Sequence, residues 1–281
     1  MSSVNLYDRV AHDTASIVIH RYSTSFGLAS RLLGAGVRDH VENVYALVRL
    51  ADEIVDGGAD IDQATARREL DALERQTDDA IANGFSTNLV VHAFAATARE
   101  VGFGTELTAP FFASMRMDVD RTAYDQEGFE RYVYGSAEVV GLMCLRAFLH
   151  PARRDDYDRL VPGARALGAA FQKVNFLRDL AADYQVLGRS YFPGVDIAGF
   201  DEATKHRLLD DIDADLAVSA AVIPQLPASS RRAVALAQSL FADLSRRLRR
   251  TPAPELIRTR VRVPNPVKAR LALSAALGAT P

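Results

Sequence analysis

Two aspartates, Asp52 and Asp56, stand about one helical turn apart in a segment that is otherwise apolar. In this segment (45–57, YALVRLADEIVDG) Tyr45 and Arg49 precede them at similar spacing, so the four polar side chains fall within roughly 60° on a helical wheel. The intervening residues are mostly Ala, Leu, Ile and Val, which suit a protein interior. The pattern therefore predicts a buried helix with one narrow stripe that ends in two carboxylates.

A second segment, 171–185 (FQKVNFLRDLAADYQ), repeats this pattern. Gln172, Asn175, Asp179 and Asp183 follow one another at spacings of 3, 4 and 4 residues, so they share one helical face within roughly 80°. Phenylalanine, leucine and valine again surround the polar residues. The chain thus carries an Asp-x-x-x-Asp stripe on each of two predicted helices.

An isolated pair of aspartates at this spacing is usually a solvated helix face. In a partly buried site, however, two carboxylates about 4 Å apart repel by about 4 kcal/mol at an effective dielectric constant near 20. A cation is expected to offset that repulsion at each stripe. The ligands are all oxygen, with no His or Cys at metal-binding spacing, which favours Mg²⁺ or Mn²⁺ over Zn²⁺. Mg²⁺ usually combines a few carboxylates with phosphate oxygens, so the stripes predict a trap for a phosphorylated substrate.

The elements that position the two stripes are predicted to be helices. Apolar residues recur with helical periodicity along the chain, and only RTRVRV at 258–263 alternates as a strand does, without a second strand to pair with. Gly, Asn and Pro turn signals separate the helical segments. We therefore predict one all-α domain over residues 1–281. Its helices are expected at 4–22, 37–56, 62–82, 87–101, 108–121, 127–149, 153–186, 201–222, 228–249 and 266–277.

Composition excludes several classes of protein. A net charge of −3 over 281 residues lacks the basic excess of a nucleic-acid binder. The single cysteine, Cys144, excludes internal disulfides and fits a reducing compartment. The first residues carry no signal pattern, and no uninterrupted apolar run is long enough to cross a bilayer. We expect a cytoplasmic protein, with peripheral contact at the inner face of the membrane as the alternative.

Four segments resemble the squalene/phytoene synthase family, the head-to-head members of the all-α isoprenoid synthases. Segment 45–57 is similar to the first aspartate-rich motif of the family, and 172–193 to its second motif and the following loop. YSTSFGLASRLL at 22–33 resembles its Ser-x-Ser-Phe segment, and YVYGSAEVVGLM at 132–143 its Tyr-x-Tyr helix. The resemblance, greatest to bacterial phytoene synthases, implies a single-domain helical bundle with a central apolar cavity.

Carried over to these positions, the resemblance implies a role for each motif residue. Mg²⁺, or Mn²⁺, would be held by Asp52, Asp56, Asp179, Asp183 and Asn175. The further catalytic residues would be Tyr45, Arg49, Arg178 and Tyr191, and the substrate would contact Ser23, Ser25, Phe26, Gln172, Asn175 and Tyr134. Two positions depart from the family pattern, Ala182 where an acidic residue is common and Glu138 where many relatives have a small one. Neither departure removes a principal metal ligand.

The family reaction joins two allylic diphosphates through a cyclopropyl diphosphate intermediate. Metal ions and arginines would stabilise the leaving diphosphate, and aromatic faces the carbocation. Phytoene formation from two C20 substrates ends in proton loss, so no nicotinamide cofactor is expected. A downstream desaturase is the expected recipient of the product. Arg260 and Lys268 are further candidates to reach diphosphate, whereas the arginines at 246–250 fit a solvated face better than a lipid-binding one.

Two alternatives remain open on the sequence. A C15-using relative would make squalene, hydroxysqualene or dehydrosqualene, and pocket depth, which decides between them, is not visible in the residues. A non-catalytic helical scaffold with the same fold is the other alternative, but it has no reason to keep four repelling aspartates. Because the aspartates should repel in the metal-free protein, replacing Asp56 or Asp179 by Asn is expected to leave that protein as stable or more stable.

Overall fold

Helices make up the regular secondary structure of the residues that this computed structural model describes, namely 5–57, 61–120, 123–187 and 191–278, with backbone alone for 181–187. The predicted all-α class is confirmed. In chain order the elements are α1 (Leu6–Tyr22), α2 (Thr24–Ser30), α3 (Ala35–Asp52), the π-helical turn η1 (Glu53–Gly57), α4 (Gln63–Asn83), α5 (Leu89–Val101), α6 (Thr105–Asp120), α7 (Gln126–Val133), the π-helical turn η2 (Tyr134–Glu138), α8 (Val139–Leu149), η3 (Arg154–Asp156), α9 (Tyr157–Leu187), α10 (Glu202–Val222), η4 (Ile223–Gln225), α11 (Ala228–Arg250), α12 (Ala253–Leu256) and α13 (Asn265–Ala276).

Short polar side chains fix where several of these helices begin. Asn5, Asp62, Asp125 and Asp201 each accept a hydrogen bond from a backbone N–H three residues further on. These N-caps satisfy donors that a helix leaves unpaired in its first turn. At the other end of α4, Gly84 closes the helix with a positive φ of 80°, a conformation that glycine adopts at little cost.

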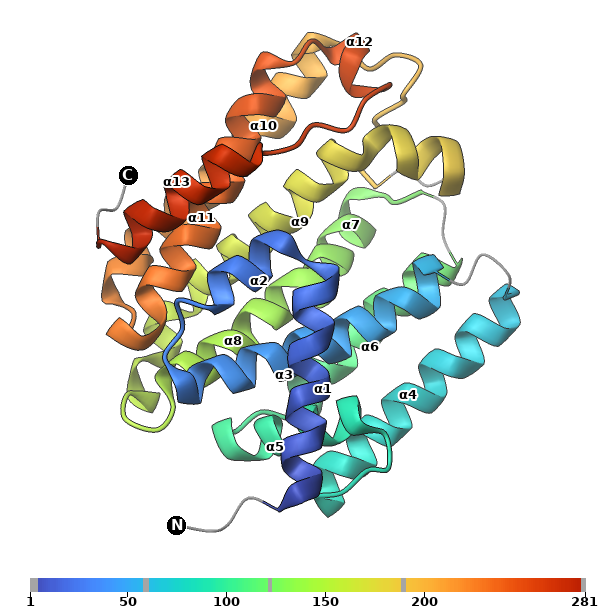
Figure 1. The fold of residues 1–281 in the computed structure, drawn as a ribbon. Coiled ribbons are helices and arrows are strands. Elements are labelled where there is room, and N and C mark those ends of the chain that lie inside the picture. Colours follow the sequence, from blue (N-terminus) through green and yellow to red (C-terminus); the bar gives the residue numbers. More distant parts are fainter. Residues whose placement is uncertain (1–4, 58–60, 121–122, 188–190, 279–281) are drawn as a thin grey trace.

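The long helix α9 runs through the middle of the molecule (Figure 1), where it packs against α8 on one side and α10 and α11 on others. The N-terminal helices α1, α3 and α5 pack on one another and reach α8. Fully buried rings such as Phe94, Phe111 and Phe112 fill the core of this N-terminal half. A second core around Phe176 and Tyr191 joins α9 to the C-terminal helices. Two cores therefore flank the middle helices.

Two glycines allow the middle helices to approach one another closely. A Cβ on Gly168 of α9 would lie 2.5 Å from the backbone oxygen of Ala137, and one on Gly135 would lie 2.2 Å from that of Pro110. Both distances are far inside van der Waals contact, so only glycine fits there without movement of a backbone. The π-helical turn η2 is thereby held between α6 and α9.

The predicted helices are present, with boundaries that differ by a few residues, but the structure adds features that periodicity did not indicate. The short helices α2 and α12 were not among the predicted helices, and the predicted helix at 127–149 is divided by η2. The segment 258–263 forms no strand; its valines, Val261 and Val263, pack on the C-terminal core while the alternating arginines stay exposed. The alternation of arginine and valine thus reflects an extended segment that is buried on one side only.

One helical stretch in the described part, Gln126–Leu149, is long and apolar enough to cross a bilayer, with a mean hydropathy of 1.3 over its best window. This finding qualifies the expectation that no run reaches that length. Half of the window is buried inside the fold, however, and a core helix passes the same test.

Candidate active site

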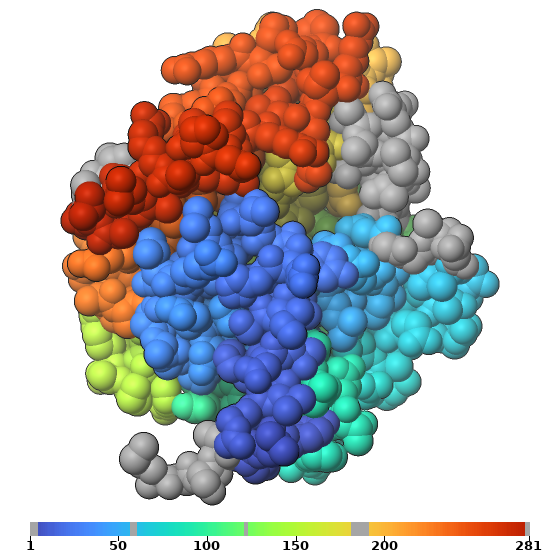
Figure 2. Space-filling view, in the orientation of Figure 1, coloured from blue at the N-terminus to red at the C-terminus, as the bar shows by residue number. Residues whose placement is uncertain are grey.

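A cavity of about 1000 Å³ lies between α2, α3, η2, α8, α9, α11 and the segment 260–268. Its lining on α9 extends from Leu160 to Asp179, a stretch of about 28 Å at the helical rise of 1.5 Å per residue. In the space-filling view the N-terminal helices (blue) and the C-terminal segment (red) meet in front of α9, which shows between them (Figure 2). The cavity is thus long, and helices from both halves of the chain enclose it.

The first acidic wall of the cavity comes from the end of α3 and from η1. Asp52 and Asp56 both line the cavity, and the side chain of Asp52 is one-third exposed to it. Burial, together with the charge of neighbouring Asp56, raises the pKa of Asp52 to about 7. The Arg49 guanidinium lies 3.8 Å from Asp52 and forms a closer ion pair with Glu53. The first wall therefore carries carboxylates that its own arginine does not fully balance.

Two buried polar atoms on the cavity wall lack hydrogen-bond partners among the described residues. They are Nε of Arg49 and Oγ of Ser136. Arg49 is held in place by Tyr22, whose ring centroid lies 4.6 Å from the guanidinium carbon. A buried donor without a partner costs free energy, so its presence at a cavity is typical of a ligand-binding position. The guanidinium group of Arg49 is suited to an anionic ligand.

The second acidic wall comes from α9. Arg178 donates to both carboxylate oxygens of Asp179, with Nε 3.0 Å from Oδ1. Arg260 approaches the same carboxylate from the C-terminal segment, with Nε 2.6 Å from Oδ1 and Nη2 3.1 Å from Oδ2. Two arginines therefore neutralise Asp179. The side chain of Asp183, the predicted partner of Asp179, lies outside the described residues.

Further cations gather at this end of the cavity. Arg262 and Lys268 line it, and Lys268 Nζ donates to the Thr24 hydroxyl at 2.8 Å. Burial and the nearby charges of Arg178 and Arg262 lower the pKa of Lys268. Sequence reasoning named Lys268 and Arg260 only as candidates, because the sequence at 258–268 gave no indication of where this segment packs.

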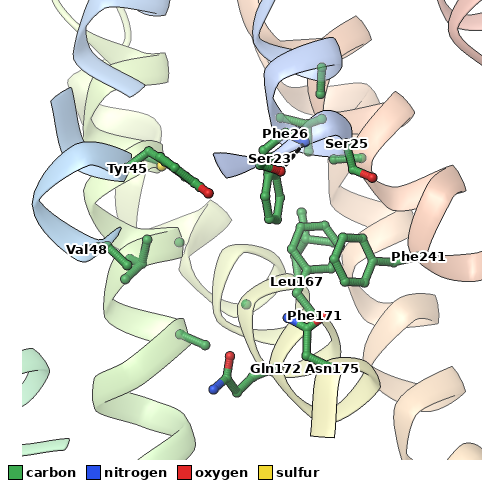
Figure 3. Close-up of a pocket in the computed structure, with 18 of the residues that line it drawn as sticks. Ser23, Ser25, Phe26, Tyr45, Val48, Leu167, Phe171, Gln172, Asn175 and Phe241 are labelled. Atoms are coloured by element: carbon green, nitrogen blue, oxygen red, sulfur yellow. Dashed lines mark hydrogen bonds between the residues drawn. The ribbon is translucent and has the colours of Figure 1, made fainter. Parts of the chain in front are cut away.

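Gln172 and Asn175 lie on the same face of α9 and line the cavity below its aromatic part (Figure 3). On the opposite side, α2 contributes the predicted Ser-x-Ser-Phe residues. Ser23 caps this helix by accepting from the Phe26 backbone N–H at 3.0 Å, and Ser25 also lines the cavity. The structure thus brings these five predicted substrate-binding residues together around one space.

Aromatic rings form the middle of the wall. Phe171 stacks on Phe241 with centroids 3.9 Å apart, and Phe26 packs on both rings at 5.7 and 5.8 Å. Tyr45 points into the same space from α3 (Figure 3), 6.2 Å from Phe26. Burial raises the pKa of the Tyr45 hydroxyl, which therefore stays neutral. Cys144, further along the wall, has its pKa raised to about 12 by burial, so its thiol is not a ready nucleophile.

Tyr134, predicted to contact substrate, is not among the residues that line the cavity. It begins η2 and packs on the N-terminal core, with the Arg165 guanidinium carbon 5.2 Å from its ring centroid. Tyr132, two residues earlier, lines the cavity instead. Two residues differ by roughly 200° on a helix, so the two tyrosines of the motif cannot share a face. Tyr132 thus occupies the position on the cavity wall that was expected for Tyr134, and substrate contact by either tyrosine stays a prediction.

Sequence reasoning missed Asp118 of α6, which is buried and lines the cavity beside the first acidic wall. It lies in MRMDVD at 115–120, and an aspartate between buried Met115 and Val119 was a signal that could have been used. Tyr191, which was predicted, lines the cavity and donates to Asp118 at 3.2 Å.

The carboxylate oxygens of the acidic walls suit Mg²⁺ better than a metal that prefers nitrogen or sulfur ligands. Within the described residues no three His, Cys, Asp or Glu side chains form a ready metal cage. Mg²⁺ does not need one, since it takes one or two carboxylates together with phosphate oxygens and water. The raised pKa of Asp52 marks a position where a divalent cation would relieve the cost of a buried negative charge.

An all-α bundle around a long cavity, with acidic and basic groups at one end, defines a class of enzyme that suits substrates with an anionic head and an apolar tail. The squalene/phytoene synthase family model matches residues 19–266, and the chain belongs to this family of prenyltransferases. The 15-cis-phytoene synthase of Paracoccus sp. is 29% identical over 88% of this chain and 85% of its own length. The 4,4'-diapophytoene synthase of Staphylococcus haemolyticus is 26% identical over 70% of this chain and 66% of its own length. A crystal structure of a dehydrosqualene synthase with a bound ligand shares the fold, with a TM-score of 0.82 at 23% identity over 96% of this chain and 97% of that one.

Proposed function

We propose that this protein is a Mg²⁺-dependent phytoene synthase, which joins two geranylgeranyl diphosphates through a cyclopropyl diphosphate intermediate and releases diphosphate. The observation that carries the proposal is the distribution of charge in the cavity. Four arginines, one lysine and four described aspartates line the end near Asp52 and Asp179, and the rest of the described wall is uncharged. That distribution matches a diphosphate head and a long hydrocarbon tail.

The metal would be held by Asp52 and Asp56 on one wall and by Asp179, Asp183 and Asn175 on the other. When bound, it supplies positive charge that stabilises the departing diphosphate. The arginines of the chain add to this effect, since a guanidinium group can donate two parallel hydrogen bonds to a phosphate. The buried Arg49 Nε, which lacks a partner among the described residues, is the donor best placed to gain one from substrate.

The apolar wall has a separate task. An allylic cation reacts rapidly with water, so a cavity lined by valine, leucine and aromatic side chains protects it. The faces of Phe26, Phe171 and Tyr45 stabilise positive charge without providing a nucleophile. The neutral thiol of Cys144 and the neutral hydroxyl of Tyr45 are consistent with that role.

Cavity length is sufficient for the C20 substrate. A fully extended chain advances by about 3.3–3.6 Å for every three bonds, so the sixteen-carbon main chain of a geranylgeranyl group spans about 17 Å. The cavity continues along α9 for about 28 Å, from Asp179 to Leu160, which accommodates that tail. A C15 tail is shorter and fits too, and the similarity to a diapophytoene synthase keeps the C15 reaction as the second candidate.

The deciding experiment is incubation of the protein with Mg²⁺ and either C15 or C20 diphosphate, with and without NADPH, followed by identification of the products. The proposal expects phytoene from the C20 substrate without reductant, and no product when the metal is chelated. If product forms with the C15 substrate and none forms with the C20 substrate, the C15 reaction is established. Full turnover in excess chelator, with metal shown to be absent, would refute the metal-dependent mechanism. Absence of product from both substrates would contradict the proposal and favour the non-catalytic helical scaffold.

The hydrocarbon product of the proposed reaction would pass to a desaturase of carotenoid biosynthesis. The similarity to phytoene and diapophytoene synthases supports this place in the pathway. A test is co-incubation with such a desaturase, in which desaturated product should form from C20 diphosphate only when both enzymes are present.

A further inference from the structure

Asp118 accepts hydrogen bonds from three tyrosines in the interior of the protein. Its Oδ2 accepts from the Tyr132 hydroxyl at 2.6 Å, and its Oδ1 accepts from those of Tyr191 and Tyr124 at 3.2 and 3.3 Å. Only 6% of Asp118 is exposed. An ionised carboxylate is an acceptor only, with room for several donors, so three O–H groups directed at one carboxyl group indicate the charged form.

The rings of these tyrosines form a continuous aromatic surface. Tyr191 stacks on Phe176 with centroids 4.0 Å apart, and Tyr132 packs on these two rings at 5.4 and 5.7 Å. All three rings line the cavity, whereas Tyr124, which lies behind Tyr191, does not. Asp118 therefore lines the cavity itself and also holds the hydroxyls of two neighbouring wall residues.

A phenol that donates its hydrogen to a carboxylate is more electron-rich than a free phenol, because the O–H bond is polarised towards the acceptor. The negative face of the ring, which attracts cations, is strengthened accordingly. Burial, with the charge of Asp118, raises the pKa of Tyr132 well above its ordinary value. The hydroxyl keeps its proton, so its oxygen is not a ready base and the ring remains a neutral aromatic group.

We propose that Asp118 is a positioning residue that orients and polarises Tyr132 and Tyr191, and that these rings with Phe176 form the subsite for the positively charged carbon of the reaction. This inference rests on the proposed function, in which an allylic or cyclopropylcarbinyl cation forms in the cavity. It assigns the cation to the wall beside the first acidic motif.

A stable cation tests this subsite without turnover. The probes are decyltrimethylammonium and decyldimethylamine N-oxide, which have nearly the same shape but differ in net charge, used below their micelle concentrations. Titration calorimetry on the full chain gives the affinity of each, and the ratio of the two affinities measures preference for a cation. The variants are Tyr132→Phe, Tyr191→Phe and Asp118→Asn, and Tyr124→Phe is the matched control because it removes a hydroxyl from the same carboxylate outside the cavity wall.

We expect each Tyr→Phe change in the wall to reduce the ratio by about fivefold and Asp118→Asn to reduce it by about tenfold, the latter equivalent to about 1.4 kcal/mol. Tyr124→Phe should keep the ratio within about twofold of the wild type. The Tyr→Phe variants leave the net charge unchanged, so a decrease there is specific to the polarised ring. They also keep the test decisive if Asp118→Asn fails to fold.

Two outcomes would overturn the inference. An unchanged ratio in both wall variants would show that the hydroxyls do not matter, even if Asp118→Asn lowers the ratio by simple loss of charge. An equal decrease in Tyr124→Phe would show a general structural effect. The substrate experiment separates this failure from failure of the proposed function. A wild type that forms phytoene without cation preference refutes the subsite alone, and one with cation preference but no prenyl product refutes the function alone.

Discussion

At the first acidic wall, Asp56 lies close enough to Asp52 to disfavour its charge, whereas at the second wall Asp179 lies between the guanidinium groups of Arg178 and Arg260. Both walls show the same Asp-x-x-x-Asp pattern in the sequence. The pattern indicates which helical face is acidic, but the charge balance depends on residues from elsewhere in the chain. A metal ion would therefore meet a negatively charged first wall. At the second wall it would compete with two arginines for the carboxylate of Asp179.

The largest expected effect is loss of turnover when either wall is neutralised. Asp52→Asn and Asp179→Asn should each reduce kcat with C20 diphosphate by about 10³-fold, since both walls act on the same diphosphate. The double variant should lose far less than the product of the two losses. Asp62→Asn is the matched control, because Asp62 is an exposed N-cap and asparagine caps a helix equally well. A comparable loss in that control would mean that the walls are not the site.

Removing Arg260 should affect the second wall alone. In Arg260→Ala, inorganic diphosphate with Mg²⁺ should bind about tenfold more weakly, because a charge-assisted hydrogen bond is lost. Mg²⁺ alone should bind as well or better, since one competitor for Asp179 is gone. Arg258→Ala, in the same exposed segment but not on the cavity wall, is the control. Calorimetric titration of both ligands measures the change, and weaker binding of Mg²⁺ alone would contradict the competition.

The two walls should respond in opposite ways when stability is measured without metal. Asp52→Asn should leave the free energy of unfolding equal or about 1 kcal/mol higher, because it removes a partly buried carboxylate with a repelling neighbour. Asp179→Asn should lower it by about 1 kcal/mol, since Arg178 and Arg260 lose their shared partner. The sequence alone predicted no loss at either wall. Urea unfolding of both variants distinguishes the two cases, and equal shifts would show that the charge balance inferred for the second wall is wrong.

The smallest effect is expected at Glu53, which follows Asp52 directly. Glu53 pairs with Arg49 but is not among the cavity-lining residues. Glu53→Gln should therefore change kcat by no more than about threefold, as is usual for a partly exposed ion pair. Steady-state kinetics beside Asp52→Asn would show whether position on the wall, rather than negative charge nearby, determines function. A loss as large as that of Asp52→Asn would remove this distinction.

Most of the helices could be predicted because apolar periodicity and capping residues are local properties of the chain. The helix α2 could not, since seven residues are too few for a periodic signal. The π-helical turn η2 is held by tertiary contacts at Gly135 and Gly168, and helical periodicity gave no indication of it. Local rules do not encode such contacts.

The same difference between local signals and tertiary contacts separates the site residues that could be predicted from those that could not. Asp52, Gln172, Asn175 and Asp179 were predicted because they repeat at helical spacing, and the structure places them around one cavity. Asp118 was missed because its partners, Tyr132 and Tyr191, are 14 and 73 residues away. Residues whose role depends on distant partners remain hidden until the fold brings them together.

The uneven charge of the cavity has a kinetic consequence. A diphosphate is held at the charged end, but a hydrocarbon product has no polar group and is retained only by apolar contact, whose strength increases with the area buried. For the proposed C40 product that area is large, so departure is expected to be slower than bond formation. A rapid first turnover should then precede a slower steady state. A detergent or lipid phase that takes up the hydrocarbon should accelerate the steady state and leave the first turnover unchanged.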